Sequence, residues 1–290
     1  MHWIEARSAE ADDAWLRAVE HAERAGDERG WSNALSWLAS SALIGPAPVA
    51  EAISRCENIR ARLSGHRREG ALVLDHLAGL EAMRGDFAAA RRLIVDRDAV
   101  MADLGVTMHT AVSHDEALVV LLSGDAAGAE AVLRAGYDRL SEMGEKALLA
   151  STAAMLAHSI LEQERPDEAW ELTQVAAEMA ADDDMSAQIG WRSVRARILA
   201  RRGEIPEAKR LSAEAVEMAG RTDWLSEHAD ALLARAEVLG LAGDPATAAD
   251  AIRNAIALYD EKGNTIGANR ARSMAASEAL TSAGSHETRR

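Results

Sequence analysis

The chain has 290 residues, of which 48% are hydrophobic and 3% aromatic, and its formal net charge is −15. This apolar content can form a sizeable core, which excludes a wholly disordered chain. The acidic balance repels phosphate backbones, so we expect no nucleic-acid partner.

The sequence also indicates a compartment. Cys56 is the only cysteine, so no internal disulfide can form, and a reducing cytoplasm is expected. Residues 1–10 lack the apolar segment of a signal peptide, and no run of eighteen apolar residues occurs. We therefore expect a cytoplasmic protein with no membrane partner.

A short motif recurs along the chain with a period of about forty residues, with Gly or Glu at an anchor position and Ala five positions later. The anchors are Gly45, Gly85, Gly124, Glu164, Gly203 and Gly243. Another small residue stands seven positions before most anchors, namely Ala78, Ala117, Ala157, Ala196 and Ala236. Helices approach closely where side chains are small, so the two series predict helix pairs that cross at these alanines.

In chain order, the pattern predicts that the chain starts with a second helix, from about Ala9 to Arg24, that lacks the first helix of its pair. Six antiparallel helix pairs follow from about Gly30 to Glu261, and all five prolines fall where a second helix begins. A last helix is expected from about Asn264 to Ala279. We predict an all-α fold, a right-handed α-α superhelix over residues 1–280, and a flexible tail over residues 281–290. Each repeat should contact only its neighbours, which leaves the N-terminal end open.

Helix pairs with this small–Gly–Ala spacing resemble tetratricopeptide repeats, in the long-repeat variety of activators related to the maltose regulator. The segments GLEAMRGDFAAAR (79–91), LRAGYDRLSEMGE (133–145) and ALYDEKGNTIGANRAR (257–272) are similar to the C-terminal helical region of actinobacterial multidomain proteins. Those proteins also carry a cyclase-like domain and an AAA-type ATPase. The resemblance implies a helical array but no ATPase, because this chain has no Gly-x-x-x-x-Gly-Lys-Ser/Thr motif.

Catalytic motifs are missing as well. Neither Gly-x-Ser-x-Gly nor His-Glu-x-x-His occurs, and Cys56 has no adjacent His or Lys to activate it. We expect no enzyme, no cofactor and no metal site.

Two surfaces are candidates for binding. In tetratricopeptide-like arrays the first helices line the concave face, and the anchor register transfers the groove positions to five polar residues. These are Asp75, His114, His158, Arg197 and Glu237. Either they form a recognition strip or they merely solvate an open groove. The second candidate is a docking edge at the open N-terminal end, where Trp3 and Trp15 would leave apolar surface uncovered.

These features predict a non-catalytic scaffold or regulatory module that binds a protein or peptide, in bacterial signalling or transcriptional control, with self-association through the N-terminal edge. The alternative is a small-ligand sensor with an effector inside the superhelix. A sensor needs a closed pocket of about 300–1,000 Å³, whereas protein binding needs a continuous strip.

Overall fold

A computed structural model describes residues 7–106 and 114–287, with side chains up to Ser277. Those residues form helices and turns and contain no strand. The helices are α1 (Ser8–Ala25), α2 (Glu28–Ile44), α3 (Val49–Arg62), α4 (Arg67–Arg84), α5 (Phe87–Asp103), α6 (His114–Leu122), α7 (Ala126–Met143), α8 (Lys146–Leu161), α9 (Pro166–Met179), α10 (Met185–Arg201), α11 (Ile205–Ala219), α12 (Leu225–Leu241), α13 (Pro245–Lys262) and α14 (Thr265–Glu287). None of these helices is long and apolar enough to cross a membrane.

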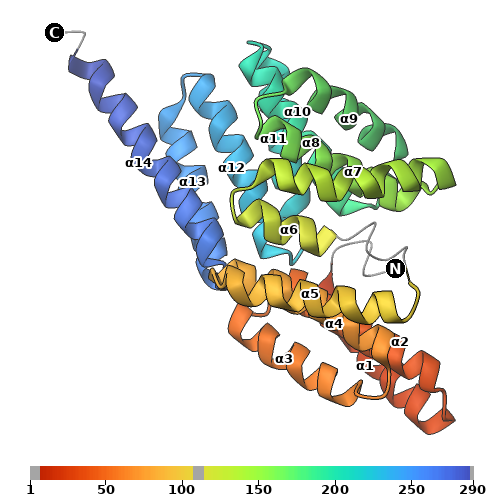
Figure 1. The fold of residues 1–290 in the computed structure, drawn as a ribbon. Helices are drawn as coiled ribbons and strands as arrows, with labels where there is room; N and C mark the ends of the chain where they lie inside the picture. Colours follow the sequence, from red (N-terminus) through yellow and green to blue (C-terminus); the bar gives the residue numbers. More distant parts are fainter. Residues whose placement is uncertain (1–6, 107–113, 288–290) are drawn as a thin grey trace.

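The helices form two layers, as expected for an α-α superhelix (Figure 1). The even-numbered first helices contact one another from pair to pair, as in α2–α4, α4–α6, α8–α10 and α10–α12. The odd-numbered second helices pack against the first helix of their own pair and against the next one. The all-α fold class is therefore confirmed.

The predicted small residues lie where the paired helices cross. All five alanines before the anchors, and the alanines after the anchors from Ala90 to Ala248, are completely buried. Because a methyl group is all that fits there, the backbones of a pair can approach closely.

The anchors end the first helices by adopting the left-handed conformation. Gly85, Gly124, Gly203 and Gly243 have φ between 76° and 94°, and Glu164 occupies the equivalent position with φ of 57°. Glycine adopts this conformation without a Cβ clash, whereas glutamate does not. Gly45 differs, since its backbone is extended with φ of −71°.

Helix α1 is a second helix that contacts α2, the first helix of the next pair, as the other second helices do. It packs antiparallel on α2, and Val19 of α1 joins the core formed with Leu35 and Leu38 of α2. At the other end, the α14 backbone is helical to Glu287, beyond residue 280 where the sequence predicted the repeat domain to end.

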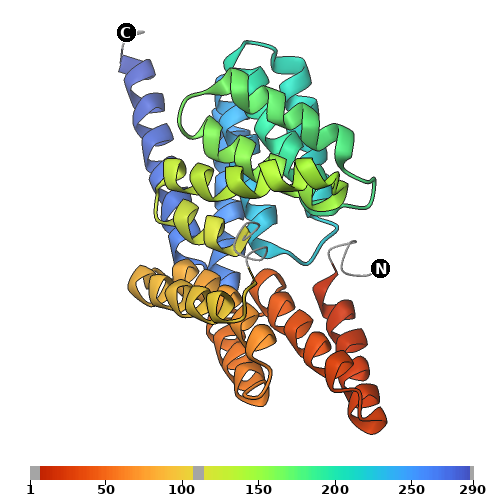
Figure 2. The ribbon, with the colours of Figure 1, turned by 45° about the vertical axis from the view of Figure 1, so that its right-hand side comes forward.

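The array also closes on itself, which corrects the expectation of neighbour contacts alone. The turn before α12 contacts the start of α1, and the α13–α14 turn contacts the ends of α2 and α4. Both ribbon views place the start of α14 beside the turn that joins α4 to α5 (Figures 1 and 2). These contacts join residues that are between 182 and 217 positions apart, so nothing in the periodicity of the sequence indicates them.

Candidate binding surface inside the superhelix

A line of partly exposed side chains runs along the side of the first helices that faces away from the second helices. On α10 the line contains Gly190, Ser193 and Arg197, and on α8 it contains Ser151, Met155 and His158. The spacing of three or four residues places each set on one helix face. Val194 and Ile198 of α10, which point elsewhere, are buried. The exposed faces of adjacent first helices therefore form one continuous surface, and in stacked helical repeats such a surface is the concave side.

Charged and polar groups on this surface form a network that we call the inner strip. It consists of His158 and Glu162 at the end of α8, Arg197 on α10, Asp230 and Glu237 on α12, and Arg270 on α14. Each member therefore comes from a first helix or from the residue that follows it.

Arg197 is the centre of the network. Its Nε lies 2.5 Å from Glu237 Oε2, and its Nη1 lies 2.8 Å from Glu162 Oε1. Arg201 adds a second donor to Glu237 at 2.8 Å. His158, Arg197 and Glu237 occupy equivalent positions in three successive repeats, so the repeat aligns them across three adjacent helices.

His158 is neutral in this setting. Burial, and then the positive charge of Arg197, lower the pKa of His158 to about 4. Its Nδ1 is 3.5 Å from Arg197 Nη1, which fits an unprotonated acceptor nitrogen. The side chain remains 33% exposed, so this neutral ring can contact a ligand.

A second ion pair completes the strip at α12 and α14. Arg270 pairs with Asp230, and the hydroxyl of Tyr259 lies 2.5 Å from Asp230 Oδ1 and 2.9 Å from Arg270 Nη2. A further acidic group, Glu227, stands one helical turn before Asp230. Burial, with the charges of Asp230 and Asp184, raises the pKa of Glu227 to about 8. At neutral pH that carboxyl is mostly protonated and can donate a hydrogen bond.

The other two predicted groove residues have different surroundings. Asp75 is only 4% exposed, and its Oδ1 accepts a hydrogen bond at 2.6 Å from Arg97, which is fully buried. Arg97 also pairs with Glu116 of α6 at 2.6 Å. Asp75 therefore belongs to a buried ionic cluster between α4, α5 and α6, and this placement corrects its assignment to an open groove.

His114 stands at the first residue of α6, with its Nε2 2.8 Å from Thr152 Oγ1 of α8. Beside it, His76 Nδ1 of α4 lies 2.6 Å from Asp115 Oδ2. Sequence reasoning missed this second pair and also missed Glu162, Arg201, Asp230 and Arg270. For His76 and Asp115 a sequence signal existed, because the two residues occupy equivalent positions in successive repeats.

The described part of the predicted N-terminal docking edge contains Trp15 of α1. The Trp15 ring stacks on Trp37 of α2 with 5.8 Å between ring centroids, and Trp37 is 37% exposed. Leu16 next to it is 48% exposed, so some apolar surface is uncovered. Trp3 lies outside the described residues.

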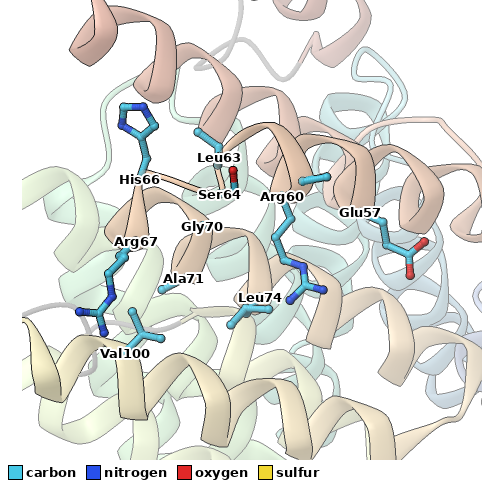
Figure 3. A pocket seen from close by; sticks show the side chains of 11 residues that line it. Glu57, Arg60, Leu63, Ser64, His66, Arg67, Gly70, Ala71, Leu74 and Val100 are labelled. Carbon is cyan, nitrogen blue, oxygen red and sulfur yellow. The ribbon is translucent and has the colours of Figure 1, made fainter.

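A pocket of about 370 Å³ lies between α3, α4 and α5, and not among the inner-strip residues (Figure 3). Arg60, His66 and Arg67 line it together with Glu57 and the apolar Leu74. Arg67 pairs with Asp103 at 2.6 Å, so part of this basic lining is already neutralised.

Comparison with solved structures places the fold among tetratricopeptide-like helical arrays. The chain is similar to the quorum sensor NprR in complex with its cognate peptide NprX, with 13% identity and a TM-score of 0.60 over 89% of this chain and 82% of that one. The apo form of NprR from B. thuringiensis gives 13% identity and a TM-score of 0.53, over 86% and 75% of the two chains. No family model and no curated protein sequence matches the chain. At this identity the likeness shows the fold alone.

Proposed function

We propose that this protein is a non-catalytic regulatory module that binds a linear peptide along its inner strip. The observation that carries the proposal is the alignment of His158, Arg197 and Glu237 on three adjacent first helices, held by ion pairs on a concave surface. Solenoids bind partners on such surfaces, because stacked repeats create an extended concave face. An extended chain can follow a strip that passes from helix to helix.

The polar chemistry of the strip fits a peptide backbone. His158 is a neutral ring, and Glu227 is protonated at neutral pH, so both can exchange hydrogen bonds with amide groups. The fold neighbour NprR has been solved with a peptide, which supports the same class of ligand here.

Selection from a random-peptide display library tests the proposal. We expect enriched peptides whose affinity falls about tenfold or more in Arg197→Met and Glu237→Gln, because each change removes part of the charged network that orients the strip. Arg210→Met, on the outward side of α11 and 53% exposed, is the matched control and should leave affinity unchanged. No enrichment, or enrichment that is indifferent to the inner variants, would contradict the proposal.

The wider context is a proposal as well. We also propose a cytoplasmic role in bacterial signalling or transcriptional control, supported by the resemblance of the segments quoted above. Self-association through Leu16, Trp15 and Trp37 is a further part of it. Sedimentation of Trp37→Ser against the parent chain tests that part, and a parent chain that stays monomeric at high concentration would contradict it.

A small-ligand sensor is the second candidate, favoured by the pocket between α3, α4 and α5, whose volume lies within the range of ligand sites. Its location differs from the interior site expected of a sensor. A thermal-shift screen of anionic metabolites on the parent chain and on Arg60→Ala tests this candidate. A rise in melting temperature that depends on Arg60 would favour it.

A further inference from the structure

The two ends of the array meet through polar groups that cap helix termini. At the start of α1, the backbone N–H groups of Ser8 and Ala9 donate to the two carboxylate oxygens of Asp223, at 2.9 and 2.8 Å. Arg7, the residue before α1, supplies no side-chain cap. Asp223 therefore caps α1 from a distant repeat, with a negative charge at the positive end of the helix dipole.

Trp224 continues this contact. Its indole Nε1 donates to Ser8 Oγ at 2.8 Å, and both residues are buried. The extended backbone of Gly45 lies beneath Ser8, since a Cβ added to Gly45 would stand 2.8 Å from Ser8 Cβ. The different conformation of the first anchor thus makes room for this end-to-end contact.

The second half of the contact is made by Lys262 at the end of α13. Its ammonium donates to the carbonyl oxygens of Ala42, Gly45 and Ala47, at 3.2, 2.6 and 2.8 Å. Carbonyl groups at a helix C-terminus lack partners within the helix, and a positive charge there complements the dipole. Lys262 is fully buried, and a buried ammonium needs such bonds to offset its loss of hydration.

One further bond ties α14 to α4. Thr265 Oγ1 donates to Met83 O at 3.1 Å, and Ile266 packs 3.4 Å from the Cβ position of Gly85. We call Asp223, Trp224, Lys262 and Thr265, with the helix ends that they contact, the clasp.

The clasp differs in kind from the contacts within the array. Successive repeats are joined by buried Leu, Ile and Ala side chains of shared core clusters. Apart from the buried Trp224 ring and the Ile266 contact, the clasp is made of hydrogen bonds, whose groups water can solvate when the contact opens. Regions that bury little apolar surface open at a lower free energy than the core.

We propose that the clasp is a reversible latch: the array opens by releasing these caps, which admits a ligand to the inner strip, and closing encloses it. The opening rests on the clasp geometry alone. Its coupling to a ligand rests on the peptide-binding function proposed above.

Lysine footprinting of the full chain with an N-hydroxysuccinimide ester measures the opening. Lys146 and Lys209 are exposed and serve as internal controls for Lys262. We expect Lys262 to react at least about tenfold more slowly than either control lysine. It should still react faster than global unfolding of the chain would allow. Low concentrations of urea should hardly change its rate, because local opening exposes little surface. A Lys262 rate equal to global unfolding, or equal to that of Lys209, would overturn the proposal.

Variants give the second readout. Asp223→Asn should increase the rate at Lys262 and the radius of gyration measured by X-ray scattering, whereas Asp13→Asn, an exposed position on α1, should change neither. Helical content measured by circular dichroism shows whether the variant is folded. If a folded Asp223→Asn keeps the parent rate and radius, the latch is wrong.

A peptide enriched by the display selection provides the last arm. It should slow the reaction of Lys262, because closing around the ligand protects the ammonium. If Lys262 reacts through local opening but the peptide does not change its rate, the latch is supported and its coupling to a ligand is contradicted. Selection of no peptide at all would count against the peptide-binding function and not against the latch.

Discussion

Glu227 shows at the residue scale how a position on the concave surface alters the chemistry of a side chain. Its carboxyl lies where burial, Asp230 and Asp184 all disfavour a negative charge, and its pKa is raised from 4.5 to about 8. A carboxyl with a raised pKa contributes stability that is complete below the unfolded-state pKa and is lost as the pH rises through the folded-state value.

This dependence of stability on pH predicts the effect of Glu227→Gln. Each pKa unit corresponds to about 1.4 kcal/mol, reduced here by partial exposure, so the variant should gain about 1–3 kcal/mol in unfolding free energy above pH 8. Below pH 4.5 it should equal the parent. Urea unfolding across this range measures it, with the exposed Glu261→Gln as the control. A gain that does not depend on pH would show that the carboxyl is not protonated in the folded state.

Arg97 is the other residue whose environment sets a clear expectation. It is fully buried and pairs with Asp75 and Glu116 at 2.6 Å and with Asp98 at 2.8 Å. Arg97→Met leaves these carboxylates without the guanidinium, and we expect a loss of about 3–5 kcal/mol in unfolding free energy. Arg92→Met, exposed on the same helix, should cost less than about 0.5 kcal/mol in the same measurement. Equal losses would mean that the cluster is not a structural unit.

At the scale of the element, five of the first helices end at a residue in the left-handed conformation, and Glu164 is the one of these residues that is not glycine. Glu164 adopts the left-handed conformation that glycine supplies in four other repeats. Its ion pair with Arg201 at 3.3 Å is weak, because the Glu164 side chain is 80% exposed.

Glu164→Gly should therefore stabilise the protein by about 0.5–1 kcal/mol, since the strain of a Cβ at positive φ outweighs the added chain entropy. The reverse change at the matched site, Gly203→Ala, should destabilise it by about 1 kcal/mol or more. Thermal unfolding of both variants checks the pair. A loss of stability in Glu164→Gly would show that the Arg201 contact outweighs the strain.

At the scale of the whole molecule, closure changes how distant substitutions combine. In an open solenoid, variants at the two ends would add, because each repeat contacts only its neighbours. Here Trp224 holds α1 and Thr265 holds α4, and both contacts depend on the same closed state.

We therefore expect Trp224→Phe and Thr265→Val to be coupled. Once one substitution releases the clasp, the second costs little, so the loss in the double variant should fall short of the sum by at least about 0.5 kcal/mol. A double-mutant cycle from urea unfolding measures this, with Gly203→Ala and Thr265→Val as the uncoupled control. Strict additivity of the clasp pair would indicate that the two contacts act independently.

The sequence by itself determined the helix pairs, their order and the residues at their crossings. It did so because the repeat places small residues and helix ends at fixed intervals, and each such signal is local. It also located three members of the inner strip, His158, Arg197 and Glu237, since equivalent positions align across adjacent repeats.

Only the tertiary structure decided that Asp75 is buried and that the array closes. These outcomes depend on curvature accumulated over many repeats, which brings Asp223 to Ser8 and Lys262 to Gly45. A pairing between such distant parts of the chain leaves no periodic trace, because only one clasp exists in the described part of the chain. At the clasp, the compact ammonium of Lys262 donates to three converging carbonyl groups, an arrangement that a planar guanidinium does not match.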